Sequence, residues 1–308
     1  MTVHLRGGAA AFLSLIIAGQ AAADCGTVRM AEPGWTDLAL TTGVASAILE
    51  GLGYETESGV LGIPVIYESM ERGDLDVFLG YWDPAMEVYF EPFRDAGTIE
   101  TVHTNLEGAK FTFAVPAYVH AAGVKDFADL AAHADAFDSK LYGIEPGSNE
   151  IMLDIVAKGA FGLGDWEVVE SSEQGMLAQV GRAARKQDWI VFLAWAPHPM
   201  NTEYDLEYLT GGDDFYGPDF GGATVHTQVR NGYLDECPNV GTLLTQMTFD
   251  IPMESEGMGY ILDDGDDPVT AGARLLKAHP EVLDGWLDGV TAKDGSDGLA
   301  AVKAHLGL

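Results

Sequence analysis

Short apolar runs alternate with helical patterns along the first two thirds of the chain. Apolar runs bounded by glycine, proline or aspartate are typical of buried strands, whereas apolar residues that recur with the helical period indicate helices. This pattern predicts strands at 27–31, 54–61, 76–79, 110–116, 141–144, 167–169 and 189–193. It predicts helices at 38–52, 65–73, 126–134, 150–159 and 176–185.

Strands that alternate with helices are characteristic of α/β folds built on parallel sheets. The pattern contains two such units in tandem. Local residues support several helix ends: Gly53 is a natural C-cap, and Ser171 and Gln174 have the spacing of a capping box before the helix at 176–185. After Asp213 the chain becomes rich in glycine and aspartate, and then shows a strand at 224–230, a helix near 239–248 and a helical C-terminal third.

Three tryptophans lie at or just past the C-terminal ends of predicted strands. They are Trp35, Trp82 and Trp195, and each is flanked by glycine, proline or aspartate. Ligands of open α/β sheets bind at this end of the strands. Aromatic faces attract a quaternary ammonium by cation–π contacts of roughly 0.5–2 kcal/mol per ring in a dry site. The alternative is that each tryptophan caps the core.

The net charge of the chain limits the kinds of molecule that it can bind. The chain has 308 residues and a formal net charge of −32, with 48 acidic and 16 basic residues. Nucleic acids and anionic membrane surfaces are therefore unfavourable partners, and a small cation is a favourable one. The same acidity also suits a protein from a saline habitat. The length allows one large domain or two.

The N-terminus has the pattern of a secretion signal. Arg6 precedes an apolar stretch at 9–18, and the small residues at 21–23 form a cleavage site, so we expect residues 1–23 to be removed and the protein to reach the periplasm. The two cysteines, Cys25 and Cys237, are expected to pair in this oxidising compartment. The alternative is two free buried thiols.

Five segments occur in the order found in a known family. They are 33–37 (PGWTD), 78–84 (FLGYWDP), 142–147 (YGIEPG), 170–176 (ESSEQGM) and 195–201 (WAPHPMN). In these the chain resembles the periplasmic substrate-binding proteins of ABC transporters for choline and glycine betaine, the choline-binding branch above all. The resemblance implies a type II-like, two-lobed α/β fold with the ligand in the interlobe cleft. It divides the chain into lobe one, 24–109 plus 214–308, and lobe two, 110–213.

The same resemblance implies the ligand-binding residues. Trp35, Trp82 and Trp195 correspond to three walls of an aromatic box, and Phe111 stands where choline binders usually have tyrosine. A polar ligand contact, asparagine in the family, corresponds to Ser148 or Asn149. The Cys25–Cys237 bridge would lie within lobe one.

Asp37 has two interpretations. Its position before the predicted helix suits an N-cap, and its position two residues after Trp35 suits a partner for a ligand cation or hydroxyl. The resemblance favours the ligand role, and both are compatible. His198 and His226 have no partner at metal-ligand spacing, so we expect no metal, and no cofactor either.

These observations favour a monomeric binding protein that captures choline and delivers it to a membrane permease. Glycine betaine, carnitine, trimethylamine oxide or dimethylsulfoniopropionate are the alternative ligands. An enzyme acting on choline esters is disfavoured because no nucleophile motif of the G-x-S-x-G type is present. A sensor module would typically carry an anchor or a signalling domain. Choline ranks first because Asp37 would repel a ligand carboxylate.

Overall fold

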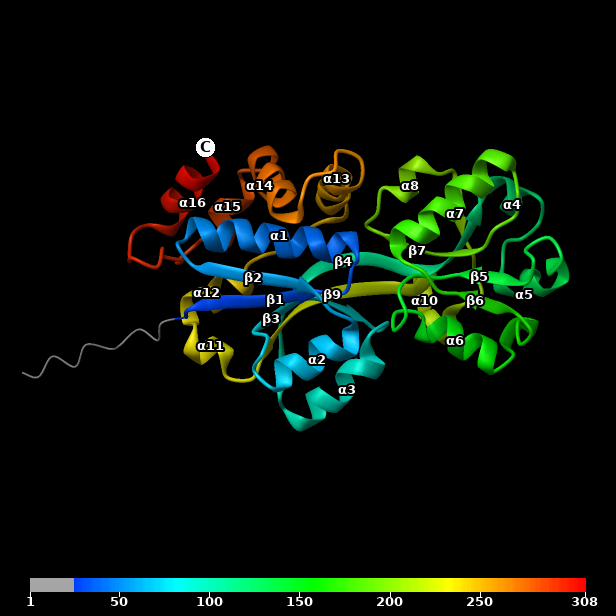
Figure 1. Cartoon of the computed structure of the whole chain (residues 1–308), viewed down its shortest axis with the longest axis horizontal. Coiled ribbons are helices and arrows are strands. Elements are labelled where there is room, and N and C mark those ends of the chain that lie inside the picture. Colours follow the sequence, from blue (N-terminus) through cyan, green and yellow to red (C-terminus); the bar gives the residue numbers. More distant parts are fainter. Residues whose placement is uncertain (1–24) are drawn as a thin grey trace, which may run out of the picture.

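A single twisted sheet runs through both lobes of the molecule (Figure 1). The structure is a computed structural model that describes residues 25–308, so the predicted secretion signal lies outside the described residues. The strands are β1 (Thr27–Glu32), β2 (Glu55–Val60), β3 (Val77–Asp83), β4 (Ile99–Pro116), β5 (Lys140–Tyr142), β6 (Glu167–Val169), β7 (Phe192–Ala196), β8 (Leu206–Tyr208) and β9 (Gly222–Arg230). Their order in the sheet is β2-β1-β3-β9-β4-β7-β5-β6, with β8 paired to β4.

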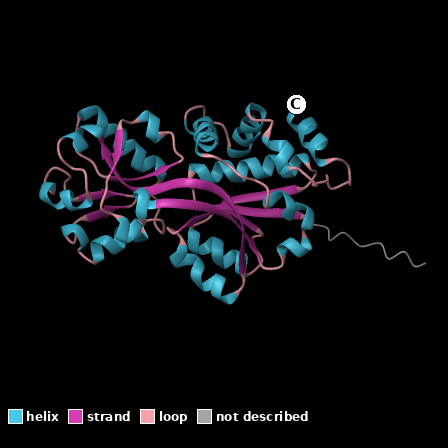
Figure 2. Ribbon diagram, turned by 180° about the vertical axis from the view of Figure 1, so that it is seen from behind, coloured by secondary structure: helices cyan, strands magenta, loops and turns pink. Residues whose placement is uncertain are grey.

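The helices cover both faces of this sheet (Figure 2). In the first lobe and the return segment they are α1 (Thr36–Gly51), α2 (Ile63–Glu71), α3 (Glu87–Ala96), α11 (Tyr233–Glu236), α12 (Pro238–Leu244), α13 (Ile251–Leu262), α14 (Pro268–Ala278), α15 (Val282–Trp286) and α16 (Gly298–Leu306). Between β4 and β9 in the chain they are α4 (Ala117–Ala121), α5 (Phe127–Leu130), α6 (Glu150–Ala157), α7 (Glu173–Lys186), α8 (Met200–Glu203), α9 (Asp213–Tyr216) and α10 (Pro218–Gly221). Within residues 25–308, no helix combines the length and hydrophobicity needed to cross a bilayer.

Two long antiparallel strands, β4 and β9, connect the lobes (Figure 1). In the first lobe, β1 pairs in parallel with β2 and β3, and β3 pairs with β9. In the second lobe, β5 pairs in parallel with β6 and β7. From Lys110 onward β4 pairs with β7, so one strand belongs to both halves of the sheet. The predicted parallel units are therefore present, joined by an antiparallel centre.

Helix α1 is buried on nearly all sides because the C-terminal helices pack over it. Its residues are apolar or small almost throughout, as expected of a helix without a solvent face. Two glycines permit close contact with α14: a methyl group on Gly272 would lie 2.5 Å from the Val44 nitrogen, and one on Gly43 would lie 2.0 Å from the Pro268 oxygen. The C-terminal third thus completes the core of the first lobe.

Several features differ from the sequence prediction. Strand β7 runs over Phe192–Ala196 instead of 189–193, and the short elements α4, α8, β8, α9 and α10 were not predicted. Helix α3 was not predicted because it contains Pro92, a residue that usually breaks helices, although Phe90 is buried and Tyr89 and Phe93 pack against the core. Strand β4 begins at Ile99 rather than Lys110, since its polar first half is stabilised by pairing with β9. The cap of α7 is Ser172, whose hydroxyl accepts from the Gly175 N–H, and not Ser171.

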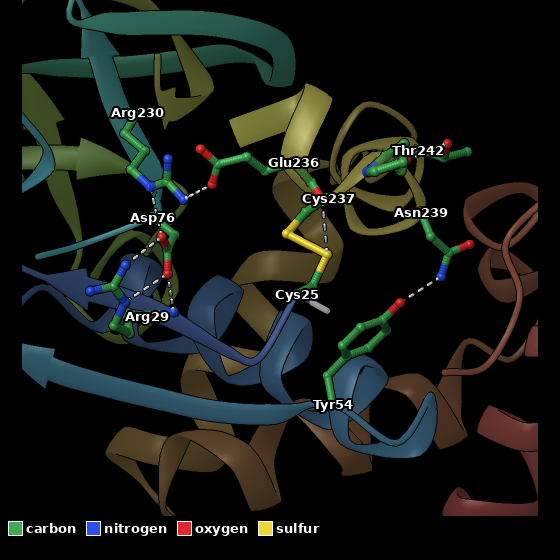
Figure 3. The surroundings of a disulfide bond; sticks show 10 residues. Cys25, Arg29, Tyr54, Asp76, Arg230, Glu236, Cys237, Asn239 and Thr242 are labelled. Atoms are coloured by element: carbon green, nitrogen blue, oxygen red, sulfur yellow. Dashed lines mark hydrogen bonds and ion pairs between the residues drawn. A yellow bond between two sulfur atoms is a disulfide. The ribbon is translucent and has the colours of Figure 1, made fainter. Parts of the chain in front are cut away.

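The disulfide bond predicted between Cys25 and Cys237 is present (Figure 3). The two Cα atoms lie 5.4 Å apart although 212 positions separate them in sequence. The bridge joins the start of β1 to the turn between α11 and α12. Beside it, Asp76 accepts hydrogen bonds from Arg29 and Arg230 at 2.8–3.0 Å. Bridge and ion pairs together fix the returning segment to the first strands.

Candidate functional site

Trp35 lies at the junction of β1 and α1, facing the cleft between the lobes. The chain turns at Gly34, whose φ of +96° favours glycine, and Trp35 then becomes the N-cap residue of α1. Trp35 is 3% exposed, and its indole lies beside the carboxylate of Glu145. The turn therefore brings a large aromatic face to the carboxyl end of β1, as the strand-end pattern predicts.

Trp82, in β3, is fixed by Asp37. Its indole Nε1 donates to Asp37 Oδ2 at 3.1 Å, and both residues are buried. Asp37 does not cap the helix: α1 begins at Thr36, so the carboxylate lies in the first turn and the N-cap interpretation is wrong. The second oxygen of Asp37, Oδ1, is buried without a partner.

Phe111 completes a group of three mutually packed rings. Its centroid is 6.3 Å from that of Trp35, with the planes 25° apart, and 6.1 Å from that of Trp82. The two indoles are themselves 6.3 Å apart and nearly perpendicular. These separations are typical of aromatic clusters that offer both faces and edges to a neighbour.

Trp195 reaches the same side of the sheet from β7. It is paired directly with Phe111 across β4 and β7, so both side chains project from one face of the sheet. Its own indole N–H is buried and unpartnered. We call Trp35, Trp82, Phe111 and Trp195 the aromatic box.

The two candidate polar contacts differ in their surroundings. The Asn149 side chain is used within its own loop: Oδ1 accepts from the Ile144 N–H, and Nδ2 donates to the carbonyls of Ile144 and Glu145 and to Glu170. Ser148 lines a small cavity together with Trp35 and Phe111. The loop geometry thus leaves Ser148 as the side chain at the cleft.

Hydrogen bonds join the lobes across the cleft. Glu173, at the start of α7, accepts from the Thr36 N–H at 2.8 Å and from the Thr36 hydroxyl at 2.7 Å. His198 Nε2 donates to the same carboxylate at 3.0 Å, and its ring lies edge-on to Trp195. The Tyr89 hydroxyl donates to the Gly147 carbonyl at 3.0 Å. The lobes therefore stand in contact around the aromatic box.

Buried carboxylates surround the box. Burial raises the pKa of Asp37 to about 8, and the nearby Glu173 acts in the same direction. Burial likewise raises the pKa of Glu32 to about 7, with Glu145 and Glu173 adding to the shift. Burial and Asp37 raise the pKa of Glu254. We call these five residues the carboxylate cluster. Because like charges are gathered in a dry site, the cluster favours a positive ligand.

Sequence reasoning did not assign Glu173, Glu254 or Thr36 to the site. Glu173 lies in one of the five quoted segments, and His198 was considered only as a metal ligand. Glu254 has no sequence signal, since α13 reaches α1 only in the folded chain.

A family model matches residues 26–278, described as the substrate-binding domain of ABC-type glycine betaine transport systems. The chain is 56% identical to an ABC-transporter choline-binding protein solved with choline, over 92% of this chain and 98% of that one, with a TM-score of 0.90. A choline-binding protein in an unliganded semi-closed conformation gives 57% identity, coverage of 92% and 99%, and a TM-score of 0.84.

A more distant relative is the glycine betaine/carnitine transport binding protein GbuC of Listeria monocytogenes. It is 29% identical over 157 residues, half of this chain and 51% of that protein. The family match covers most of the chain, and the paired lobes, cleft and fold agree with it. The chain belongs to the substrate-binding domain family of ABC-type glycine betaine transport systems.

Proposed function

We propose that this protein binds choline in the aromatic box and delivers it to the membrane permease of an ABC transporter. The observation that carries the proposal is the mutual packing of Trp35, Trp82 and Phe111. Trp82 is in turn bound to the buried carboxylate of Asp37, whose Oδ1 lacks a partner. Aromatic faces attract the trimethylammonium group, and Asp37 supplies a negative charge and an acceptor for the choline hydroxyl. Likeness to a protein solved with choline supports the same ligand.

We assign the remaining site residues by their positions. Trp195 would form the wall beside Phe111, because the two residues are paired on neighbouring strands and project from the same sheet face. Ser148 would contact the ligand at the cleft, and Asn149 would hold the loop that presents it. The protein would act as a monomer in the periplasm, after removal of residues 1–23.

We place the lobe boundaries near residues 109 and 214. The change of partner strand along β4 at Lys110 supports the first of these positions. The long β4 and β9 strands would then form the hinge.

Glycine betaine is the second candidate. The described function of the family favours it, and the N-terminus of α6 after Ser148 offers backbone N–H groups to a carboxylate. Asp37 and its acidic neighbours disfavour a carboxylate in the same cleft.

Isothermal titration calorimetry of the mature protein tests the assignment. Choline, glycine betaine, carnitine, trimethylamine oxide and dimethylsulfoniopropionate are titrated in one buffer. We expect choline to bind at least about tenfold more tightly than the zwitterions, a difference of about 1.4 kcal/mol. If a zwitterion bound more tightly than choline, that zwitterion would be assigned as the ligand instead. If none of the five compounds bound, the proposed function would be rejected.

A further inference from the structure

The interlobe carboxylate of Glu173 has a role that simple lobe contact does not explain. It is fully buried, and both its oxygens accept hydrogen bonds, from the Thr36 N–H, the Thr36 hydroxyl and His198. Three donors and no acceptor partner suit an ionised carboxylate. Thr36 is in the first lobe and Glu173 in the second, so the two bonds from Thr36 exist only when the lobes are closed. The bond from His198 lies within the second lobe.

His198 satisfies Glu173 without neutralising it. The His198 Nδ1 accepts the Met200 N–H at 2.9 Å, so the ring proton resides on Nε2, which donates to Glu173. An imidazole that accepts at one nitrogen and donates at the other is neutral. All three donors to Glu173 are therefore uncharged groups.

Closure also places Glu173 beside other carboxylates. Its partner Thr36 immediately precedes Asp37. In the first lobe, the negative charge of Glu173 adds to burial in raising the pKa of Asp37 and Glu32. Glu145, in the second lobe, accepts from the Glu173 N–H at 2.9 Å. The charged side chains with the largest effects on Asp37, Glu32 and Glu254 are all acidic. Closing the lobes thus brings like charges together in a site with little water.

We propose that Glu173 is a specificity-determining residue, whose carboxylate makes closure of the lobes depend on a ligand with net positive charge. The ligand would be the counter-ion that offsets repulsion between Asp37 and Glu173. A quaternary ammonium cation supplies one positive charge, whereas a zwitterion returns a carboxylate to the same cleft and supplies none. The proposal rests on the proposed function, since it takes the cation to occupy the aromatic box.

The test compares Glu173→Gln with Thr36→Val. Glutamine keeps an acceptor for the Thr36 N–H and removes the charge, whereas valine removes one hydrogen bond and keeps the charge. Choline and glycine betaine are titrated into each variant by calorimetry, with circular dichroism to confirm folding. For Glu173→Gln we expect the ratio of choline to betaine affinity to fall at least about tenfold. For Thr36→Val we expect similar losses for both ligands, which leaves the ratio unchanged.

An unchanged ratio in Glu173→Gln would overturn the proposal and leave Glu173 as a contact that only holds the lobes. Absence of choline binding by the wild type would instead reject the proposed function, so the two failures are distinguishable.

A second measurement uses the wild type, so it tests the proposal even if Glu173→Gln does not fold. The compound 3,3-dimethyl-1-butanol has the shape of choline without its charge. Small-angle X-ray scattering at saturating ligand should show compaction with choline and none with the neutral analogue. Equal compaction by both would contradict a requirement for net charge.

Discussion

The four side chains of the aromatic box differ in how they are held. Trp82 is oriented by its hydrogen bond to Asp37, whereas the indole N–H of Trp195 is buried without a partner. An indole held by packing alone depends on its neighbours for orientation. Removal of one ring should therefore affect the other walls as well as the proposed contact with ligand.

Replacement of Trp35, Trp82 or Trp195 by alanine should weaken choline binding by at least tenfold, about 1.4 kcal/mol each. Choline should also quench or shift the fluorescence of the wild type. Trp189→Ala is the control, because Trp189 packs against His133 and Phe137 away from the box. Wild-type affinity in all three box variants would show that these tryptophans serve only the core.

Asp37→Asn should lower choline affinity and leave glycine betaine affinity level or raised. The change removes the charge and keeps an acceptor oxygen for Trp82 Nε1. Because Asp37 lies in the first turn of α1 and does not cap it, the helix should persist. Calorimetry measures both ligands, and thermal unfolding checks the fold. Equal losses for the two ligands with a lowered melting temperature would show a purely structural role.

At the scale of elements, the contact between α1 and α14 holds the first turn of α1 in place. The helices approach closely because Gly43 and Gly272 carry no side chains at the contact. The position of Thr36 and Asp37 thus depends on helices that are more than 200 residues away in sequence. A looser contact here would move the site as well as lower stability.

Gly272→Ala should destabilise the protein by about 1–3 kcal/mol, because the new methyl group would lie 2.5 Å from the Val44 nitrogen. Gly285→Ala is the matched control: Gly285 is also helical, in α15, and a methyl group there meets nothing within 4 Å. That change should be neutral or stabilising by up to about 1 kcal/mol. Urea denaturation measures both, and similar effects at the two positions would contradict the packing argument.

At the scale of the whole molecule, we expect the choice of ligand to depend on whether the buried carboxylates of the closed site are protonated. Burial raises the pKa of Asp37 to about 8, so the closed site without a cation holds a proton there below that pH. The groups facing Asp37 are Glu173 from α7, Glu254 from α13 and the indole of Trp82 from β3. A bound cation lowers the pKa of Asp37 and displaces the proton, whereas a zwitterion does so less.

The ratio of choline affinity to glycine betaine affinity should therefore rise as the pH increases from about 6 to about 8. One proton limits the slope to about tenfold per pH unit. Calorimetry across this range measures the ratio. In Asp37→Asn most of the pH dependence of this ratio should be lost. A small part should remain because burial raises the pKa of Glu32 to about 7. Parallel pH profiles for the two ligands in the wild type would refute the linkage.

The sequence by itself determined the alternation of strands and helices, the pairing of Cys25 with Cys237 and the arrival of three tryptophans at strand ends. These features are local patterns, or a choice between only two cysteines, so they need no knowledge of packing. Helix α3 was missed because of its internal Pro92. The polar half of β4 was missed because its stability comes from pairing with β9 rather than from its own apolar periodicity.

Only the tertiary structure decided how the acidic residues are used. Asp37 suits a helix cap by sequence, yet it lies within α1 and holds Trp82. Glu173 suits an ordinary first-turn acid of α7, yet it crosses the cleft to Thr36. Local sequence sets the backbone that presents a side chain. The charge and hydrogen bonds around that side chain come from elements distant in sequence. The bonds between Thr36 and Glu173 also require that the two lobes come together.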